Sequence, residues 1–170
     1  MNLAESFSYA FGEVAGDARR VVTGVDAATV AWRPDAEANS IGWLVWHLAR
    51  TEDSHITEIA GRSQLWNDDW AQQLGLPAGY DDTGYGHDAE EVGRIRPAPE
   101  PLLAYVEAVT EMVRAELAAM PSDEFDRIID ASYDPPVSVG VRLNSVLSDA
   151  LQHIGQAAYV RGMYERANGS

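Results

Sequence analysis

The sequence has no cysteine, no lysine and no long apolar run. Without cysteine the chain can form no disulfide, no thiolate zinc site and no cysteine nucleophile, so any metal ion must be bound by His, Asp and Glu side chains. No apolar segment approaches the roughly 20 residues that a helix needs to cross a bilayer. The amino-terminal segment also lacks a basic stretch followed by an apolar one, so we expect no signal peptide and a cytoplasmic protein.

Positive charge is scarce as well. The 12 basic residues are all arginines, and they are outnumbered by 27 Asp and Glu residues, which gives a formal net charge of -15. Such a field repels the phosphate backbone of nucleic acids and anionic membrane surfaces, so we expect neither as a partner. The 170 residues contain no internal repeat and no low-complexity linker. They therefore predict a single domain that spans residues 1–170.

Several catalytic motifs are missing too. The chain contains no Gly-rich phosphate loop, no G-x-S-x-G nucleophile elbow and no H-E-x-x-H metal motif. These absences argue against a nucleotide-binding enzyme, a serine hydrolase of the elbow type and a zincin-like protease.

Four segments carry apolar residues at the three- and four-residue steps of an amphipathic helix. They cover about residues 3–22, 41–59, 100–120 and 143–167, and Ser40 is a suitable N-cap for the second. The connections between them are longer than tight turns. We therefore predict an all-α fold, a four-helix bundle with crossover loops.

The connecting segments have different compositions. Residues 23–40 indicate an irregular connection, whereas residues 61–99 are rich in Gly, Asp, Pro and Tyr, with short helices near 68–74 and 88–95. A loop this long inside a compact domain is uncommon and is often functional. β-Branched and aromatic residues around "DPP" in residues 125–143 predict a short extended excursion before the last helix.

Three polar residues fall on the inward faces of the predicted helices. His47 lies within the apolar run "SIGWLVWHLARTED", and Asp149 and His153 lie four residues apart at the edge of the last helix's apolar arc. A carboxylate beside an imidazole on a half-buried face must share a proton, a partner or a cation. Two imidazoles and one carboxylate from facing helices suit a catalytic divalent metal that keeps an open position.

Simpler interpretations of these residues remain open at this stage. His47 alone is also compatible with a hydrogen-bonded core histidine, and Asp149 with His153 is compatible with an ion pair on a helix surface. His55, on the same predicted helix as His47, is expected to be solvated or to support the ligands from behind.

Three stretches together resemble the DinB-like superfamily, and in particular its actinobacterial branch related to mycothiol-dependent maleylpyruvate isomerase and mycothiol S-transferases. They are "NSIGWLVWHLARTEDSHITEIAGRSQLW", the loop "LGLP...DTGYGH...EEV" and "DALQHIGQAAYVRGMYE", within a similarity that covers about residues 5–166. The resemblance implies a four-helix bundle with a divalent metal, usually zinc. It places the family's metal ligands on His47, Asp149 and His153, in agreement with the spacing. Where many relatives carry a further histidine, this chain has Gln156, which would hydrogen-bond substrate or water.

The resulting hypothesis is a divalent-metal-dependent thiol transferase or isomerase. Zn²⁺ is the expected metal, mycothiol or a similar low-molecular-weight thiol the expected cosubstrate, and an electrophile the second substrate. The loop that carries Tyr85 and His87 is expected to cover the site, with His87 contacting substrate or transferring a proton, or else only capping its own turn. A non-catalytic metal- or small-ligand-binding stress protein, a metal-dependent hydrolase and a homodimeric assembly are the alternatives that the sequence leaves open.

Overall fold

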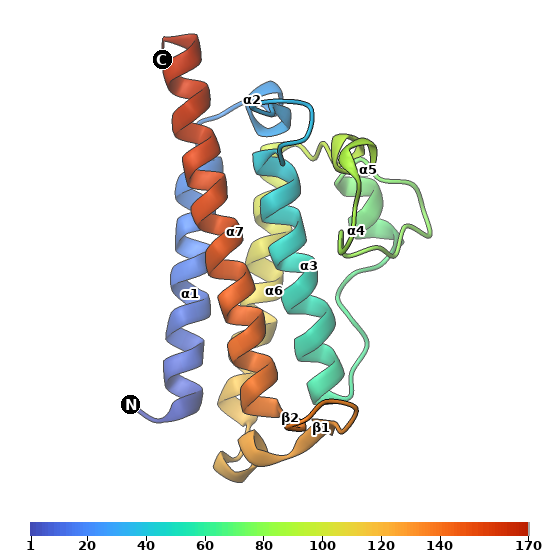
Figure 1. The fold of residues 1–170 in the computed structure, drawn as a ribbon, viewed down its shortest axis with the longest axis vertical. Helices are drawn as coiled ribbons and strands as arrows, with labels where there is room; N and C mark the ends of the chain where they lie inside the picture. The colour runs from blue at the N-terminus through green and yellow to red at the C-terminus, as the bar shows by residue number, and fades with distance from the viewer. Residues whose placement is uncertain (170) are drawn as a thin grey trace.

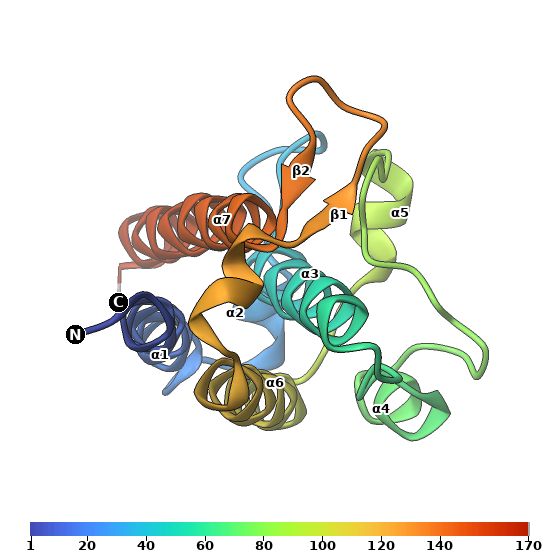
Figure 2. The same ribbon diagram turned by 90° about the horizontal axis from the view of Figure 1, so that it is seen from below.

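Four long helices lie side by side in the computed structural model, which describes residues 1–169 (Figure 1). They are α1 (Leu3–Val22), α3 (Ile41–Ala60), α6 (Pro99–Ala119) and α7 (Val139–Asn168). Figure 2 shows them end-on as the four corners of a bundle, which confirms the predicted all-α class. In Figure 1, α1 and α7 run in one direction while α3 and α6 run in the other. Since α3 and α6 are parallel, the chain between them must return along the bundle, which is the predicted crossover.

The helix ends follow local capping chemistry. Asn2 and Glu5 form a capping box at the start of α1, the Ser40 hydroxyl accepts a hydrogen bond from the Trp43 amide at 3.1 Å, and α3 ends at Gly61 in the left-handed conformation. The predicted starts of α1 and α3 are therefore confirmed to the residue.

The start of α7 was predicted too late. The helix begins at Val139, because the side chain of Ser138 caps it and Gly140 fits under the carbonyl oxygen of Phe125. A Cβ atom at Gly140 would lie 3.2 Å from that oxygen. Because glycine has a low helix propensity, the sequence did not predict the first turn of α7. In the structure, the absence of a side chain at Gly140 permits close packing against Phe125.

Short elements fill the connections. The segment predicted to be irregular contains α2 (Ala27–Ala31), capped by Asp26 and too short to show a helical period. The crossover carries α4 (Asp68–Gln73) and α5 (Ala89–Arg94), and the extended excursion is a two-stranded antiparallel sheet of β1 (Ile128–Asp130) and β2 (Val137–Ser138), preceded by the 3₁₀ helix η1 (Ser122–Asp126). The short helices and the excursion are thus close to their predicted places.

The core lies between the four long helices, and α3 is buried on more than one side. Its inner face packs against α7 and α6, while the crossover with α4 and α5 lies along its outer side in both views. Its fully buried residues include Trp46, Leu48 and Ile56, but also the charged Arg50 and Asp53. No helix within residues 1–169 is both long enough and apolar enough to cross a membrane.

Candidate metal centre

His47 of α3 meets Asp149 and His153 of α7 in the seam between the two helices. One ligand atom from each of the three residues lies within 4.8 Å of the other two. Nε2 of His47 is 3.8 Å from Oδ2 of Asp149, and Nδ1 of His153 is 3.3 Å from the same oxygen. The ligand atoms of a tetrahedral zinc ion are roughly 3–4 Å apart, so the 3.8 Å between Nε2 of His47 and Oδ2 of Asp149 suits a shared ion. Nδ1 of His153 bonds the Asp149 carbonyl oxygen, so Nε2 of His153 would be its ligand atom. The structure therefore brings together the three residues that the spacing predicted.

Hydrogen bonds fix which nitrogen of each imidazole carries the proton. Nδ1–H of His47 donates to the carbonyl oxygen of Thr83 at 2.5 Å, and Nδ1–H of His153 donates to the carbonyl oxygen of Asp149 at 2.8 Å. A carbonyl oxygen only accepts, so both protons sit on Nδ1 and each Nε2 keeps its lone pair. This is the arrangement by which a backbone carbonyl orients a metal-binding histidine.

The carboxylate of Asp149 has spare acceptor capacity at this point. Its Oδ2 atom is buried and has no hydrogen-bond partner among the described residues. Burial alone would raise the pKa of Asp149, but the nearby imidazoles of His153 and His47 lower it below its usual value. The pKa of His47 is lowered by burial, which favours the neutral imidazole. Burial lowers the pKa of His153, but its hydrogen bonds to Asp149 and the charge of that carboxylate raise it above its usual value, so a divalent cation would compete with a proton at this ring. The neutral His47 and the ionised Asp149 are in the states that a divalent cation requires.

The indole of Trp43 contacts three histidine rings around the site, although the sequence indicated only a packing role for it. Its ring stacks on His47 with centroids 4.7 Å apart, and it lies 5.9 Å from the ring of His153 and 6.2 Å from that of His87. Trp43 is 6% exposed. It therefore shields one side of the imidazole pair from water and holds His47 in a single orientation.

His87 lies behind this indole and outside the metal triad. Nε1–H of Trp43 donates to Nδ1 of His87 at 3.1 Å, so the proton of His87 is on Nε2, which lies 3.2 Å from Oδ2 of Asp82. The side chain of His87 is 3% exposed and both nitrogens are engaged. The contacts tie the crossover loop to α3; a role in substrate contact or proton transfer stays a prediction.

Gln156 and His55 are placed differently. Gln156 is exposed on α7, one turn beyond His153, and it is not among the residues that line the pocket beside the triad. Its interaction with substrate or water stays a prediction. His55 lines that pocket two turns along α3 from His47, and Arg142 of α7 donates to its Nδ1 at 3.1 Å.

Gly84 lets the crossover loop touch the site. It has φ +90°, and a Cβ atom there would lie 2.9 Å from the Trp46 ring, 3.0 Å from Nδ1 of His47 and 3.1 Å from the Trp43 ring. Because Thr83 precedes it, this close approach also places the carbonyl oxygen that orients His47. In the sequence this loop is marked by the "TGYGH" stretch. Which of its two glycines makes the close approach can be decided only from the fold.

We expect Gly84→Ala to weaken metal binding about tenfold, because the added methyl group pushes Thr83 away from His47. Gly86→Ala is the matched control: Gly86 also has a positive φ, +79°, but nothing lies within 4 Å of its Cβ position. Both variants carry the backbone strain, about 1–2 kcal/mol, which urea unfolding measures. Equal metal affinities for the two variants would contradict the proposed role of the close approach.

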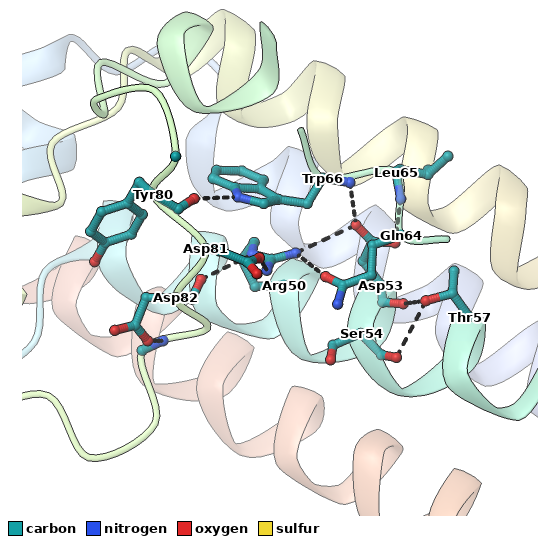
Figure 3. A network of polar contacts seen from close by, with 12 residues as sticks. Arg50, Asp53, Ser54, Thr57, Gln64, Leu65, Trp66, Tyr80, Asp81 and Asp82 are labelled. Atoms are coloured by element: carbon teal, nitrogen blue, oxygen red, sulfur yellow. Dashed lines mark hydrogen bonds and ion pairs between the residues drawn. The ribbon is translucent and has the colours of Figure 1, made fainter. Parts of the chain in front are cut away.

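A buried network fastens the same loop to α3 (Figure 3). The guanidinium of Arg50, fully buried, donates from Nε to the carbonyl oxygen of Asp82 at 3.1 Å and from Nη1 to Gln64 at 2.8 Å. It lies 3.5 Å from the carboxylate of Asp53 and 4.5 Å from the ring centre of Trp66. Asp82 is the residue before Thr83, so Arg50 holds the peptide next to the one that orients His47.

Asp53 satisfies the other side of this network. Its carboxylate accepts hydrogen bonds from the Leu65 amide at 2.9 Å and from the Trp66 amide and the Tyr105 hydroxyl at 2.8 Å each. The pair Arg50 and Asp53 was visible in the sequence as charges three residues apart on a largely apolar helix. The burial of the pair could not be predicted from the sequence, because only the packed crossover segment excludes water from it.

Glu52 is a second buried acid near the triad. It is 3% exposed, and its Oε1 atom has no hydrogen-bond partner in the described chain. Burial, with a further contribution from the charge of Asp149, raises the pKa of Glu52 to about 8. The side chain is therefore predominantly a neutral carboxylic acid at pH 7.

These features define a helical-bundle protein with a candidate two-histidine, one-carboxylate metal centre in the seam of α3 and α7. The family model of the DinB superfamily matches residues 10–157, so the chain belongs to that superfamily. A crystal structure of a conserved protein from Enterococcus faecalis has the same fold: the TM-score is 0.86 at 26% identity, over 95% of this chain and 96% of that one. No curated protein matches the sequence.

Proposed function

We propose that the protein is a divalent-metal-dependent thiol transferase or isomerase of the cytoplasm, with Zn²⁺ as its metal and mycothiol or a similar low-molecular-weight thiol as cosubstrate. The observation that carries the proposal is the triad of His47, Asp149 and His153, with an unpartnered carboxylate oxygen between two oriented imidazoles. Members of the superfamily to which the chain belongs are often metal-binding. The resemblance of "TGYGH" and the late helix to the mycothiol-dependent branch supports the thiol.

The chain's own residues would perform three tasks. His47, Asp149 and His153 would hold the metal ion, which when bound would lower the pKa of a thiol and stabilise its thiolate. Trp43 excludes water from one side of the site, and Thr83 keeps the proton of His47 on Nδ1. The attacking sulfur must come from a substrate, because the chain has no cysteine.

Replacing His47 by Ala should abolish metal retention, because it removes the ligand contributed by α3. Element-resolved metal analysis after dialysis measures this directly. His55→Ala is the control, since His55 lies on the same helix and outside the triad, and it should keep the metal of the wild type. Full metal occupancy in His47→Ala would refute the assigned ligand.

The thiol chemistry has its own test. Metal-loaded protein is titrated with mycothiol and then with chlorodinitrobenzene, and we expect saturable thiol binding and formation of the thioether, both lost in His47→Ala. Metal binding without either result would favour a non-catalytic binding protein. Turnover of activated esters by the metal-loaded protein without any thiol would instead favour a metal-dependent hydrolase.

A further inference from the structure

A pocket of about 400 Å³, in the range of small-molecule sites, opens beside the triad between α3 and α7. Its wall includes His47 and Asp149, with Thr83 and Tyr85 of the crossover loop. Its other lining residues follow His47 on α3 or precede Asp149 on α7; they are Thr51, Ser54, His55, Ser145 and Val146. Because α3 and α7 run in opposite directions (Figure 1), both groups lie on the same side of the triad. A ligand whose reacting atom lies at the triad can therefore extend its remainder along this pocket.

Three hydroxyl groups in this wall have spare hydrogen-bonding capacity. The side chains of Thr51, Ser54 and Ser145 line the pocket, and none of them makes a hydrogen bond within the described residues 1–169. Other threonines of the helices do, since the hydroxyls of Thr57 and Thr110 donate to backbone carbonyl oxygens at 2.6 and 2.7 Å. The three pocket hydroxyls therefore keep both their donor and their acceptor capacity for water or a ligand.

The wall of the pocket is nearly uncharged. Asp149 is the one carboxylate among the described lining residues, and it faces the imidazoles that would share a metal ion with it. Burial above all, and then the charge of Arg142, lowers the pKa of His55, which favours the neutral ring. Arg142 and Glu58 carry opposite charges, lie 3.1 and 3.6 Å from Nδ1 of that ring, and are both outside the pocket lining. The described lining thus offers no cation to an anionic ligand, in a chain whose net charge of -15 repels anions.

We infer that this pocket binds the tail of the thiol substrate and selects a tail that is uncharged and hydroxylated, which Thr51, Ser54 and Ser145 recognise. The inference rests on the proposed function for the position of the sulfur at the triad. Thr51 and Ser54 follow His47 by four and seven residues, so they lie about 6 and 10 Å beyond it along the helix axis. An apolar tail would displace water from the three hydroxyls without replacing its hydrogen bonds. An anionic tail would lose hydration without gaining a cation.

The test uses Co²⁺-loaded protein, in which the thiolate–Co²⁺ charge-transfer absorption reports the binding of thiols. Three of them have six carbon atoms and differ in the tail: 1-thiosorbitol is hydroxylated, 1-hexanethiol is apolar and 6-mercaptohexanoate is anionic. Mercaptoethanol is too short to fill the pocket and reports the triad alone. We expect 1-thiosorbitol to bind about tenfold more tightly than either of the other six-carbon thiols, because only its tail pairs with the wall.

Variants of the wall separate recognition by the pocket from the different acidities of the thiols themselves. Thr51→Val keeps the shape of the side chain and removes its hydroxyl, and Ser145→Ala removes the hydroxyl on α7. Each should lower the preference for 1-thiosorbitol over 1-hexanethiol about threefold. Ser148→Ala removes an exposed hydroxyl of α7 outside the pocket lining and should leave that preference unchanged. Mercaptoethanol should bind equally to all of these proteins, which shows that each variant is folded and loaded with metal.

The outcomes separate this inference from the proposed function. Binding of mercaptoethanol together with equal affinities for 1-thiosorbitol and 1-hexanethiol would overturn the inference and leave the thiol site standing. Binding of 6-mercaptohexanoate as tight as that of 1-thiosorbitol would contradict the selection of an uncharged tail. A preference that is unchanged in both Thr51→Val and Ser145→Ala would refute the residues assigned to it. No absorption with any thiol would sink both the inference and the proposed function.

Discussion

Replacing Asp53 by Ala is expected to destabilise the protein by about 3–5 kcal/mol, because it leaves the fully buried guanidinium of Arg50 without its buried counter-charge. The change also removes the acceptor for the amides of Leu65 and Trp66 and for the Tyr105 hydroxyl. Urea unfolding followed by tryptophan fluorescence measures the effect. Metal affinity should fall as well, since the same network holds the loop that orients His47.

Asp81→Ala is the matched control for this prediction. Asp81 lies at the same distance from Arg50 as Asp53 does, 3.5 Å, but its side chain is 82% exposed. Water screens that pair, so its removal should change stability by less than about 1 kcal/mol. Similar losses for Asp53→Ala and Asp81→Ala would show that burial of the network is not what makes it stabilising.

Replacing Glu52 by Gln is expected to stabilise the protein at alkaline pH and to leave it nearly unchanged in acid. The folded protein holds the proton of Glu52 up to a pKa of about 8, whereas the ordinary value is 4.5. Between these values the unfolded chain has already lost the proton, so the folded state becomes less stable as the pH rises. The glutamine amide cannot ionise, and the variant escapes this loss.

The size of this effect follows from the shift. One unit of pKa corresponds to about 1.4 kcal/mol, so the advantage of Glu52→Gln should grow to about 3–5 kcal/mol between pH 4.5 and pH 8.5. Urea midpoints of both proteins across that interval measure it. Glu111→Gln, at an exposed position on α6, should give no comparable trend. A pH-independent difference between wild type and Glu52→Gln would contradict the burial of a neutral acid.

Local rules account for what the sequence predicted correctly. Ser40 is a cap whose chemistry involves neighbours within three residues, so the start of α3 could be placed from the sequence, and the apolar stripe placed α1. Asp149 and His153 are four residues apart on one helix, and helical geometry alone puts them side by side. His47 on a second apolar stripe completed the candidate site, because two such stripes must face each other in a bundle.

Contacts between distant segments account for the features that the sequence did not predict. Gly84 and Gly86 are alike in sequence, yet only Gly84 touches the rings of Trp43, Trp46 and His47. Glu52 and Asp53 are adjacent acids, yet Asp53 is fully hydrogen-bonded and Glu52 holds an unpartnered oxygen. These differences depend on which elements pack against each face of α3, and the spacing of apolar residues along the sequence does not predict this.

The sequence by itself determined the helical bundle, the ends of most helices and the three candidate metal-binding residues, because each follows from caps, from helical spacing and from the need of apolar stripes to face each other in a bundle. Tertiary structure alone decided how the centre is held: the crossover folds back on α3, buries Arg50 with Asp53 and brings the carbonyl of Thr83 to His47. It also set Arg142 of α7 against His55 of α3, 87 residues away along the chain. The physical reason is that desolvation and hydrogen-bond geometry depend on neighbours in space, which only the packed chain supplies.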